Sequence, residues 1–597
     1  MKIASLFAAL AACALCTGPA SAQGLATAPL SQSDVLREVR PLSEADAARY
    51  REAFAAQEKG DWKTADRVIG AIEDPVLLGY LLEQRYMHPT AYRSSYRELA
   101  RWLDAYADHP NAGPVHRLAL RRRPVGETPR RPAKRRWRTE PPKPLPAELE
   151  ADYRANPHGR AEVRRIELRL RSLLSRDRPT QALNYLNEPR QFNRLTRAQT
   201  DRVRGWIAES FYFNGKLSQA RALAVAAADR SPDSAVLAHW IAGLSHMRME
   251  DPARAYSYFA RMAAIEEQTP RLRAAGAYWA ARTAIAAGRA DAVTAHLETA
   301  AGMPLTLYGQ LALGQLGRES GIDWTPPVLT VSDYDRLTSL SPRIARAAAL
   351  AQIGHEREAQ DELRWVHAEL PQEEDTTLAA LTHVLDLPTA QLMIALSGGA
   401  YEPENAQLRA GLFPVPDYAP NGGFTVDRAL LFALIRQESK FMTHARSRVG
   451  AAGLMQLMPR TAAYISRDRS LAHSRSRASD KLYEPGYNMQ LGQSYVEYLL
   501  SEHDDGSRDL FAMMLSYNWG PGNYRRWQAR NPIDDPLLRI ESVPNPEARG
   551  FVDHVMTNLW LYRERLGEPA PSRDALAAGG APVYRSVSEG ARGLSAD

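Results

Sequence analysis

Apolar residues recur at helical spacing along most of this chain. From about residue 26 to residue 403 the sequence is rich in Ala, Leu and Arg with short polar breaks, and this pattern predicts a long series of helices. A further helical stripe follows, in which Leu430 and Leu434 are continued at the same four-residue spacing by Glu438. Because residues four apart lie on one face of a helix, a carboxylate is expected at the end of an apolar face. The pattern as a whole predicts a mainly α protein.

A Gly-x4-Ala signature marks places where one predicted helix turns into the next. Its three copies begin at Gly60, Gly215 and Gly354, and a looser copy at residues 250–255 lies 35 residues after the second. Glycine readily ends a helix, and alanine lets the following helix pack closely against it. The repeats resemble degenerate tetratricopeptide units, so we expect an N-terminal α-superhelix over residues 23–301. A plain helical bundle is the alternative.

Residues 1–22 have the plan of a secretory signal peptide. Lys2 precedes an apolar run, and small residues precede Gln23 as they do at a cleavage site. Both cysteines, Cys13 and Cys16, lie inside this segment, so the mature chain is expected to lack disulfides and thiolate chemistry. No later segment has 18 consecutive apolar residues, which predicts an exported protein without a transmembrane span.

Charge and composition add further expectations. The net charge of +6 and the pI near 9.1 suit an anionic partner, such as nucleic acid, a cell-wall polymer or a membrane surface, without choosing among them. Residues 117–146 are so rich in Pro and Arg that we predict an exposed loop, a patch that holds a polyanion being the alternative. Residues 302–420 are expected to contain the end of the superhelix and a small helical linker domain, and residues 568–597 a disordered tail.

Glu438 is the main candidate for chemistry. If its carboxylate is buried without a partner, the charged form is penalised and the pKa rises, as a general acid working near neutral pH requires. The alternative is a helix-end glutamate that reaches water or is capped by a neighbour.

Other polar residues stand in apolar surroundings. Gln456 lies between Leu and Met residues, so it needs a hydrogen-bonding partner if it is buried. Tyr517 and Asn518 end another predicted helix, where we expect them near a rim. His444 and His473 are isolated, and no His or Cys cluster has metal-ligand spacing, so no metal or organic cofactor is expected.

Four groups of residues form a series of motifs in the C-terminal part of the chain. They are Glu438, Ser439, Phe441, Ala445, Ser447, Gly450, Ala451, Gly453 to Gln456, Met458 and Pro459 in the first group; Pro485, Asn488, Gly492 and Tyr495 in the second; Ser516 to Asn518 and Gly520 to Gly522 in the third; and Glu541 to Pro544, Glu547, Arg549, Gly550 and Val552 in the fourth. In order and spacing these groups resemble the motifs of soluble lytic murein transglycosylases.

This resemblance implies a goose-lysozyme-like, mostly helical catalytic domain at residues 421–567, after the superhelix and the linker. It implies cleavage of the MurNAc–GlcNAc β-1,4 bond of peptidoglycan with formation of 1,6-anhydro-MurNAc. Glu438 matches the family's catalytic glutamate, which acts first as general acid and then as general base. The positions that match substrate-binding residues of the family are Ser447, Gln456, Met458, Tyr517, Asn518 and Glu541.

The resemblance also implies peptidoglycan glycan strands as the partner rather than nucleic acid, and a periplasmic location. Complexes with other cell-wall enzymes stay open. Two other functions remain as alternatives: a hydrolytic muramidase of the same fold, whose product would have a reducing end, and a catalytically inactive helical scaffold that binds the cell wall. The intact motif around Glu438 disfavours the scaffold.

Overall fold

The computed structural model describes residues 32–134, 137–138, 147–156, 158–472, 477–502 and 507–586. The predicted signal peptide, both cysteines and His473 lie outside these ranges. Within them the regular secondary structure is helical, and β structure is limited to isolated bridges such as the one between Arg446 and Ala452. None of the described helices is both long and apolar enough to cross a membrane.

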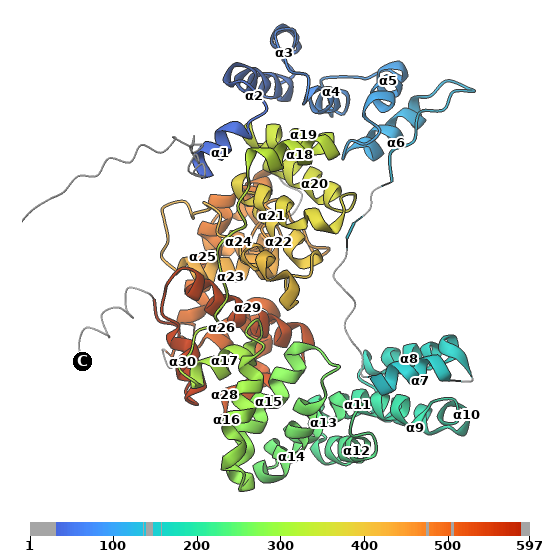
Figure 1. The fold of residues 1–597 in the computed structure, drawn as a ribbon, viewed down its shortest axis with the longest axis vertical. Coiled ribbons are helices and arrows are strands. Elements are labelled where there is room, and N and C mark those ends of the chain that lie inside the picture. The colour runs from blue at the N-terminus through green and yellow to red at the C-terminus, as the bar shows by residue number, and fades with distance from the viewer. Residues whose placement is uncertain are drawn as a thin grey trace, which may run out of the picture.

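The helices fall into two end regions and a middle region along the long axis of the molecule (Figure 1). The first end region combines the start of the chain with a later segment. Its elements are α1 (Gln32–Glu38), α2 (Glu44–Glu58), α3 (Trp62–Ile69), α4 (Leu78–Tyr86), α5 (Tyr96–Tyr106), α6 (Ala112–Arg122), α18 (Val331–Leu340), α19 (Pro342–Gln352), α20 (Glu356–His367), η3 (Gln372–Glu374), α21 (Asp375–Val384), α22 (Pro388–Ser397) and η4 (Pro403–Leu412).

The opposite end region is built from the chain between these two segments. Its helices pack in sequence order, each against the next, as expected for a superhelix. They are α7 (Ala147–Ala155), α8 (Gly159–Leu174), α9 (Pro179–Asn187), α10 (Pro189–Phe192), α11 (Arg197–Phe213), α12 (Leu217–Arg230), α13 (Val236–Arg248), α14 (Pro252–Ala264), α15 (Pro270–Ala284), η1 (Ile285–Ala287), η2 (Ala290–Ala292), α16 (Val293–Ala301) and α17 (Leu307–Gln315).

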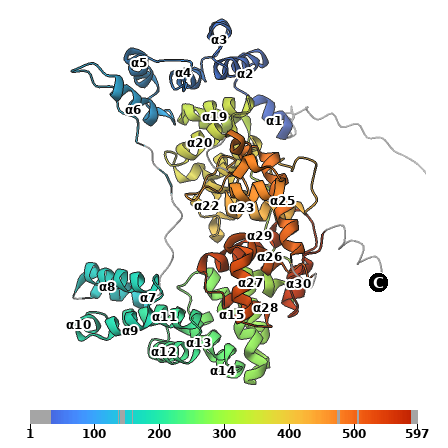
Figure 2. The ribbon, with the colours of Figure 1, turned by 180° about the vertical axis from the view of Figure 1, so that it is seen from behind.

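The middle region contains the C-terminal part of the chain. Its central pair is α23 packed against α29, and the two end regions project from it to the same side (Figures 1 and 2). The elements are α23 (Arg428–Glu438), α24 (Pro459–Ser466), η5 (Arg469–Ala472), η6 (Arg477–Tyr483), α25 (Pro485–Ser501), α26 (Leu510–Trp519), α27 (Pro521–Arg530), α28 (Pro536–Glu541), α29 (Pro546–Arg565) and α30 (Pro571–Ala577).

The predicted glycine turns are present at the three helix junctions that the signature marks. Gly60, Gly215 and Gly354 have φ values of +73°, +72° and +84°, a left-handed conformation that glycine adopts without steric cost. In the looser copy, Glu250 occupies the same conformation with φ +58°. The alanines that follow are fully buried between the paired helices; they are Ala65, Ala220, Ala255 and Ala359. The prediction that the Gly-x4-Ala signature marks turns between paired helices is therefore confirmed.

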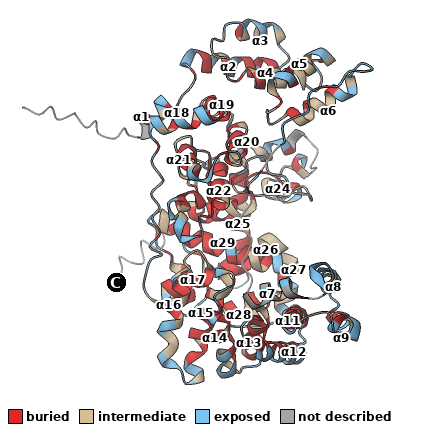
Figure 3. Cartoon of the chain, turned by 45° about the vertical axis from the view of Figure 1, so that its right-hand side comes forward, coloured by how far each residue is buried: buried red, intermediate tan, exposed pale blue. Residues whose placement is uncertain are grey.

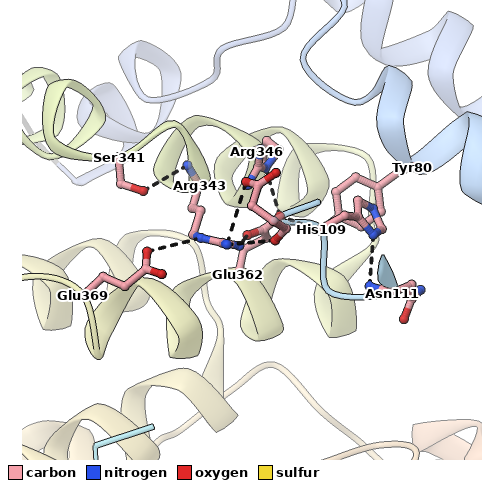
Figure 4. Close-up of polar contacts among 9 residues, drawn as sticks. Tyr80, His109, Asn111, Ser341, Arg343, Arg346, Glu362 and Glu369 are labelled. Atoms are coloured by element: carbon pink, nitrogen blue, oxygen red, sulfur yellow. Dashed lines mark hydrogen bonds and ion pairs between the residues drawn. The ribbon is translucent and has the colours of Figure 1, made fainter. Parts of the chain in front are cut away.

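A buried ionic cluster joins α4 and the α5–α6 turn to α19 and α20 (Figure 4). Glu362, which is fully buried, accepts a hydrogen bond from the hydroxyl of Tyr80 at 2.8 Å. It also accepts from the guanidinium groups of Arg343 at 2.7 Å and Arg346 at 2.9 Å. The same two arginines donate to the carbonyl and the carboxylate of Asp108. Because a buried charge needs a partner, this cluster ties together segments that lie far apart in sequence.

The segment predicted as a basic loop, 117–146, is a loop only in part. α6 continues through residue 122, so the first residues of the segment are helical. Further on, Arg138 donates to the carboxylate of Asp375 at 2.7 Å, and the guanidinium of Arg364 lies 4.9 Å from the ring centroid of Trp137. Residues 137 and 138 are therefore docked on the first end region. Residues 135–136 and 139–146 lie outside the described part.

The expectation of a disordered tail from residue 568 is wrong as far as residue 586. α30 lies in this segment, and the indole of Trp560 donates to Ser572 at 3.0 Å. Tyr584 is 3% exposed, and its hydroxyl accepts a hydrogen bond from the backbone N–H of Asp427 at 3.1 Å. This segment thus packs against the start of α23, the helix that ends at Glu438. Residues 587–597 lie outside the described part.

Buried residues are concentrated along α22 of the first end region and α29 of the middle region (Figure 3), and α23 is buried from residue 429 to residue 435. One continuous apolar cluster extends from the first end region through the middle to the opposite end. A smaller separate cluster holds α5 and α6 together around Trp102. The catalytic segment predicted from sequence is therefore at the centre of the main core.

Candidate active site

Helix α23 places Glu438 at the edge of the core. Its residues from 429 to 435 are buried, and α29 covers it along its length. The helix ends at Glu438 because Lys440 and Phe441 both adopt positive φ values, +53° and +65°. Phe441 turns back into the core and packs edge-on against Phe432, with 5.8 Å between ring centroids. Glu438 is therefore held at a rigid helix end, as the apolar stripe predicts.

The environment of Glu438 favours its neutral form. The side chain is partly buried, and among the described residues no group is within hydrogen-bonding distance of its carboxylate. Burial raises its pKa to about 8, with a smaller contribution from the negative charge of Glu547 at the start of α29. A carboxyl group in this state holds a proton at neutral pH and can donate it.

The loop after α23 is fixed by Gly453 and Asn488. Gly453 has φ +78°, and a Cβ atom there would lie 2.1 Å from the carbonyl oxygen of Leu482 and 2.3 Å from the side-chain nitrogen of Asn488. Asn488 is fully buried; its side chain accepts from the N–H of Met455 at 2.8 Å and donates to the carbonyl groups of Ala452 and Leu482. Only glycine therefore fits at residue 453. Because Gly453 belongs to the first sequence motif and Asn488 to the second, the two motifs meet at this contact.

This loop presents three of the predicted substrate-binding residues. The amide of Gln456, at φ +47°, donates to the carbonyl groups of Ala445 at 3.1 Å and Gly453 at 2.8 Å. The Ser447 hydroxyl accepts from the N–H of Ala451 at 2.9 Å. Met458 is 39% exposed, a large value for an apolar side chain next to the core. Gln456 therefore has the hydrogen-bonding partners that its apolar surroundings require.

Tyr517 connects this loop to Glu438. Its hydroxyl donates to the carbonyl of Met455 at 2.7 Å, and its ring stacks on Phe551 with 5.9 Å between centroids. The pKa of Tyr517 is raised well above its ordinary value, first by burial and then by the negative charge of Glu438. Asn518 follows it, partly buried, at the end of α26.

Glu541 is held at the contact between the middle region and the opposite end region. It is 6% exposed and accepts a hydrogen bond from the hydroxyl of Tyr308 at 2.8 Å. Burial raises its pKa, and the nearby charge of Arg271 opposes that rise. The sequence motif groups Glu541 with substrate-binding residues, whereas the structure gives it a buried partner on α17.

Two neighbours of the candidate site received no individual role from the sequence. Glu547 adds negative charge near Glu438, and Tyr495 packs on Tyr517 with 5.3 Å between ring centroids. Both belong to the quoted motifs, but their roles depend on contacts between α29, α25 and α26. Among the described residues no group of three or more His, Cys, Asp or Glu side chains could hold a metal ion. His444 is stacked on Tyr483.

A family model for the transglycosylase SLT domain matches residues 419–536, the segment that contains α23 to α27 and the residues around Glu438. Residues 419–536 form an SLT domain. The resemblance seen in the sequence motifs is thereby confirmed. Over 147 residues this chain is 34% identical to the soluble lytic murein transglycosylase of Salmonella typhimurium. That match includes 24% of this chain and spans 22% of the length of the relative.

Solved structures resemble the fold beyond the SLT domain. An inactive mutant of the lytic transglycosylase Slt from Pseudomonas aeruginosa has a TM-score of 0.51 at 20% identity, covering 90% of this chain and 89% of the other. The 70-kDa soluble lytic transglycosylase from Escherichia coli has a TM-score of 0.52 at 19% identity, covering 87% and 97%. The predicted fold class, a mainly α chain with an N-terminal superhelix, a helical linker and a lysozyme-like C-terminal domain, is therefore confirmed.

Proposed function

We propose that this protein is a lytic transglycosylase that cleaves the MurNAc–GlcNAc β-1,4 bond of peptidoglycan and leaves a 1,6-anhydro-MurNAc end. The single observation that carries the proposal is the partly buried Glu438 inside the SLT domain, whose pKa burial raises. Peptidoglycan strands are the proposed binding partner. The periplasm is the proposed location, because the sequence begins like a signal peptide and the curated relatives act on murein by name.

Glu438 would act twice in one turnover. With a pKa of about 8 it carries a proton at neutral pH, which it gives to the glycosidic oxygen as the bond to the GlcNAc unit breaks. The resulting carboxylate then takes the proton of the C6 hydroxyl of MurNAc while that oxygen attacks C1. The proton lost in the first step is regained in the second, and no water is consumed. The N-acetyl group of the substrate would stabilise the positive charge that develops at C1.

The loop and helix around Glu438 would position the sugar. We assign Ser447, Gln456 and Met458 to one wall of the binding site and Tyr517 with Asn518 to the other. Tyr517 is well placed for this role, because one hydrogen bond to the carbonyl of Met455 ties both walls together. A rigid frame of this kind keeps the acid and the bond aligned and lowers the entropic part of the barrier.

The remaining regions would serve the same site. We propose the division predicted from sequence, with the superhelix and linker at residues 23–420 and the catalytic domain at 421–567, extended through the ordered segment to residue 586. Glu541, through Tyr308, would fix the catalytic domain on the superhelix rather than touch the substrate.

The proposal is tested with the Glu438→Gln variant of the full chain, incubated with purified peptidoglycan sacculi. The amide keeps the size of the side chain and removes the proton, so release of soluble fragments should fall by roughly a thousandfold, within the range for general acid–base catalysis. Glu497→Gln on the exposed face of α25 is the matched control and should keep full activity. Comparable turnover by the Glu438→Gln variant would overturn the assignment.

A further inference from the structure

A cavity lies on the SLT domain, in the segment that follows Met458. Its volume is about 780 Å³, within the range of about 300–1,000 Å³ that is usual for ligand sites. It is formed by α24, the segment that follows it and one residue of α25. The residues that line it are Arg460, Ala463, Tyr464, Ile465, Arg467, Arg469, Ala472 and Tyr498.

Three arginine side chains line the cavity. Arg460, Arg467 and Arg469 are exposed, and in the part of the chain that the structure describes none of them is paired with a carboxylate. The neighbouring carboxylates are engaged elsewhere. Asp468 accepts hydrogen bonds from the N–H and hydroxyl of the same residue, Ser470, and Glu502 accepts from Tyr498 and pairs with a guanidinium on α27. The cavity therefore presents free guanidinium groups, which bind carboxylates with two parallel hydrogen bonds.

A row of tyrosine rings links this cavity to the candidate active site. Tyr517, which donates a hydrogen bond to the carbonyl of Met455, contacts Tyr495 at 5.3 Å between ring centroids, and Tyr495 stacks on Tyr498 at 6.3 Å. Tyr498 in turn meets Tyr464 edge-on at 5.7 Å. Tyr464 is 65% exposed and lies one helical turn after Arg460, so an aromatic ring and a cation share one face of α24.

We propose that this cavity, defined by Arg460, Arg467, Arg469, Tyr464 and Tyr498, binds a carboxylate-bearing segment of a glycan strand distal to the bond that is cleaved. The arginines would hold the carboxylates, and the exposed ring of Tyr464 would pack against a sugar face. This inference rests on the proposed function, because the tyrosine row places the cavity next to the bound strand. The carboxylates come either from the lactyl groups of MurNAc or from attached stem peptides.

The test measures binding of three soluble tetrasaccharides of alternating GlcNAc and MurNAc to the full-length Glu438→Gln protein by calorimetry. One carries stem peptides, one carries free lactyl carboxylates, and one has these carboxylates amidated. In the Arg460→Gln/Arg469→Gln double variant, affinity for at least one of the two anionic ligands should fall about tenfold, and affinity for the amidated ligand should not change. The anionic ligand that is affected identifies the source of the carboxylate.

The matched control is Arg526→Gln/Arg530→Gln, which removes two exposed charges from α27 of the same domain. It should leave all three affinities unchanged, and the loss in the test variant should shrink as salt screens the charges. Equal affinities of parent and test variant for both anionic ligands, or an equal loss for the amidated one, would overturn the proposal. Failure of the proposed function is recognised separately, as the absence of anhydro products from sacculi treated with the unmutated protein.

Discussion

At the scale of single residues, the protonation state of Glu438 decides which chemistry the site can perform. Its carboxyl group has a raised pKa because it is taken out of water, and Glu547 adds to the effect. For a carboxyl group a raised pKa means that the folded protein prefers the neutral acid. The chemistry proposed for it begins with donation of this proton.

The rate should therefore depend on pH in a defined direction. Turnover should be high in the mildly acidic to neutral range and fall as pH rises through about 8, where Glu438 loses its proton. The kcat for a soluble glycan substrate, measured between mildly acidic and alkaline pH, checks this expectation. A rate that stays constant from neutral to strongly alkaline pH would show that a group other than Glu438 carries the proton.

A substitution of Glu547 distinguishes the proposed reaction from a mechanism that uses two carboxylates. In the Glu547→Gln variant the negative charge near Glu438 is lost, so the pKa of Glu438 should fall and the alkaline limb of the pH profile should move to lower pH. Activity at mildly acidic pH should stay within a few-fold of the parent. Loss of roughly a hundredfold or more there would instead identify Glu547 as a base or nucleophile of a hydrolytic enzyme.

At the scale of elements, the loop after α23 depends on one glycine. Gly453→Ala should destabilise the protein by about 2–4 kcal/mol, because the added Cβ meets the carbonyl of Leu482 and the side chain of Asn488 in a left-handed backbone. Gly422→Ala is the control: φ there is +88°, but nothing lies within 4 Å of the added Cβ. Its cost should be about 1 kcal/mol. Equal unfolding midpoints for the two variants in urea would contradict this view of the loop.

Helix type and helix junctions could be predicted from the sequence because their causes are local. The spacing of Leu430, Leu434 and Glu438 fixes one face of α23, and glycines such as Gly215 adopt the left-handed conformation that ends a helix. The motif around Gln456 could likewise be recognised in the sequence, although its hydrogen bonds to backbone carbonyl groups could not.

The rest could not be predicted because it depends on contacts between distant segments. Composition suggested a disordered tail, but one buried ring, Tyr584, anchors that segment to Asp427. The partner of Glu541 is Tyr308, far away along the chain, so the motif alone could not place this carboxylate at an interface. The tyrosine row from Tyr517 to Tyr464 joins three helices in the same way.

At the scale of the whole molecule, the first end region is assembled from two distant segments that meet at Glu362. Replacing it with Gln leaves Arg343 and Arg346 without their buried counter-charge, which should cost about 3–5 kcal/mol. Hydrogen exchange should increase first in α1 to α6. The control is Glu369→Gln. The Glu369 carboxylate also lies 3.4 Å from the guanidinium of Arg343, but its side chain is 44% exposed, so loss of its charge should cost less. If both variants unfold at the same temperature, the cluster does not hold this region together.

The mass of the fragments that the protein releases from peptidoglycan tests the central claim most directly. If Glu438 moves one proton out and back while the C6 hydroxyl of MurNAc attacks C1, every new MurNAc end is an anhydro sugar, lighter by one water than a reducing end. We expect mass spectrometry of the soluble fragments to show anhydro ends as the main product, and the Glu438→Gln variant to release roughly a thousandfold less of it. Fragments with reducing ends as the main product would contradict the account.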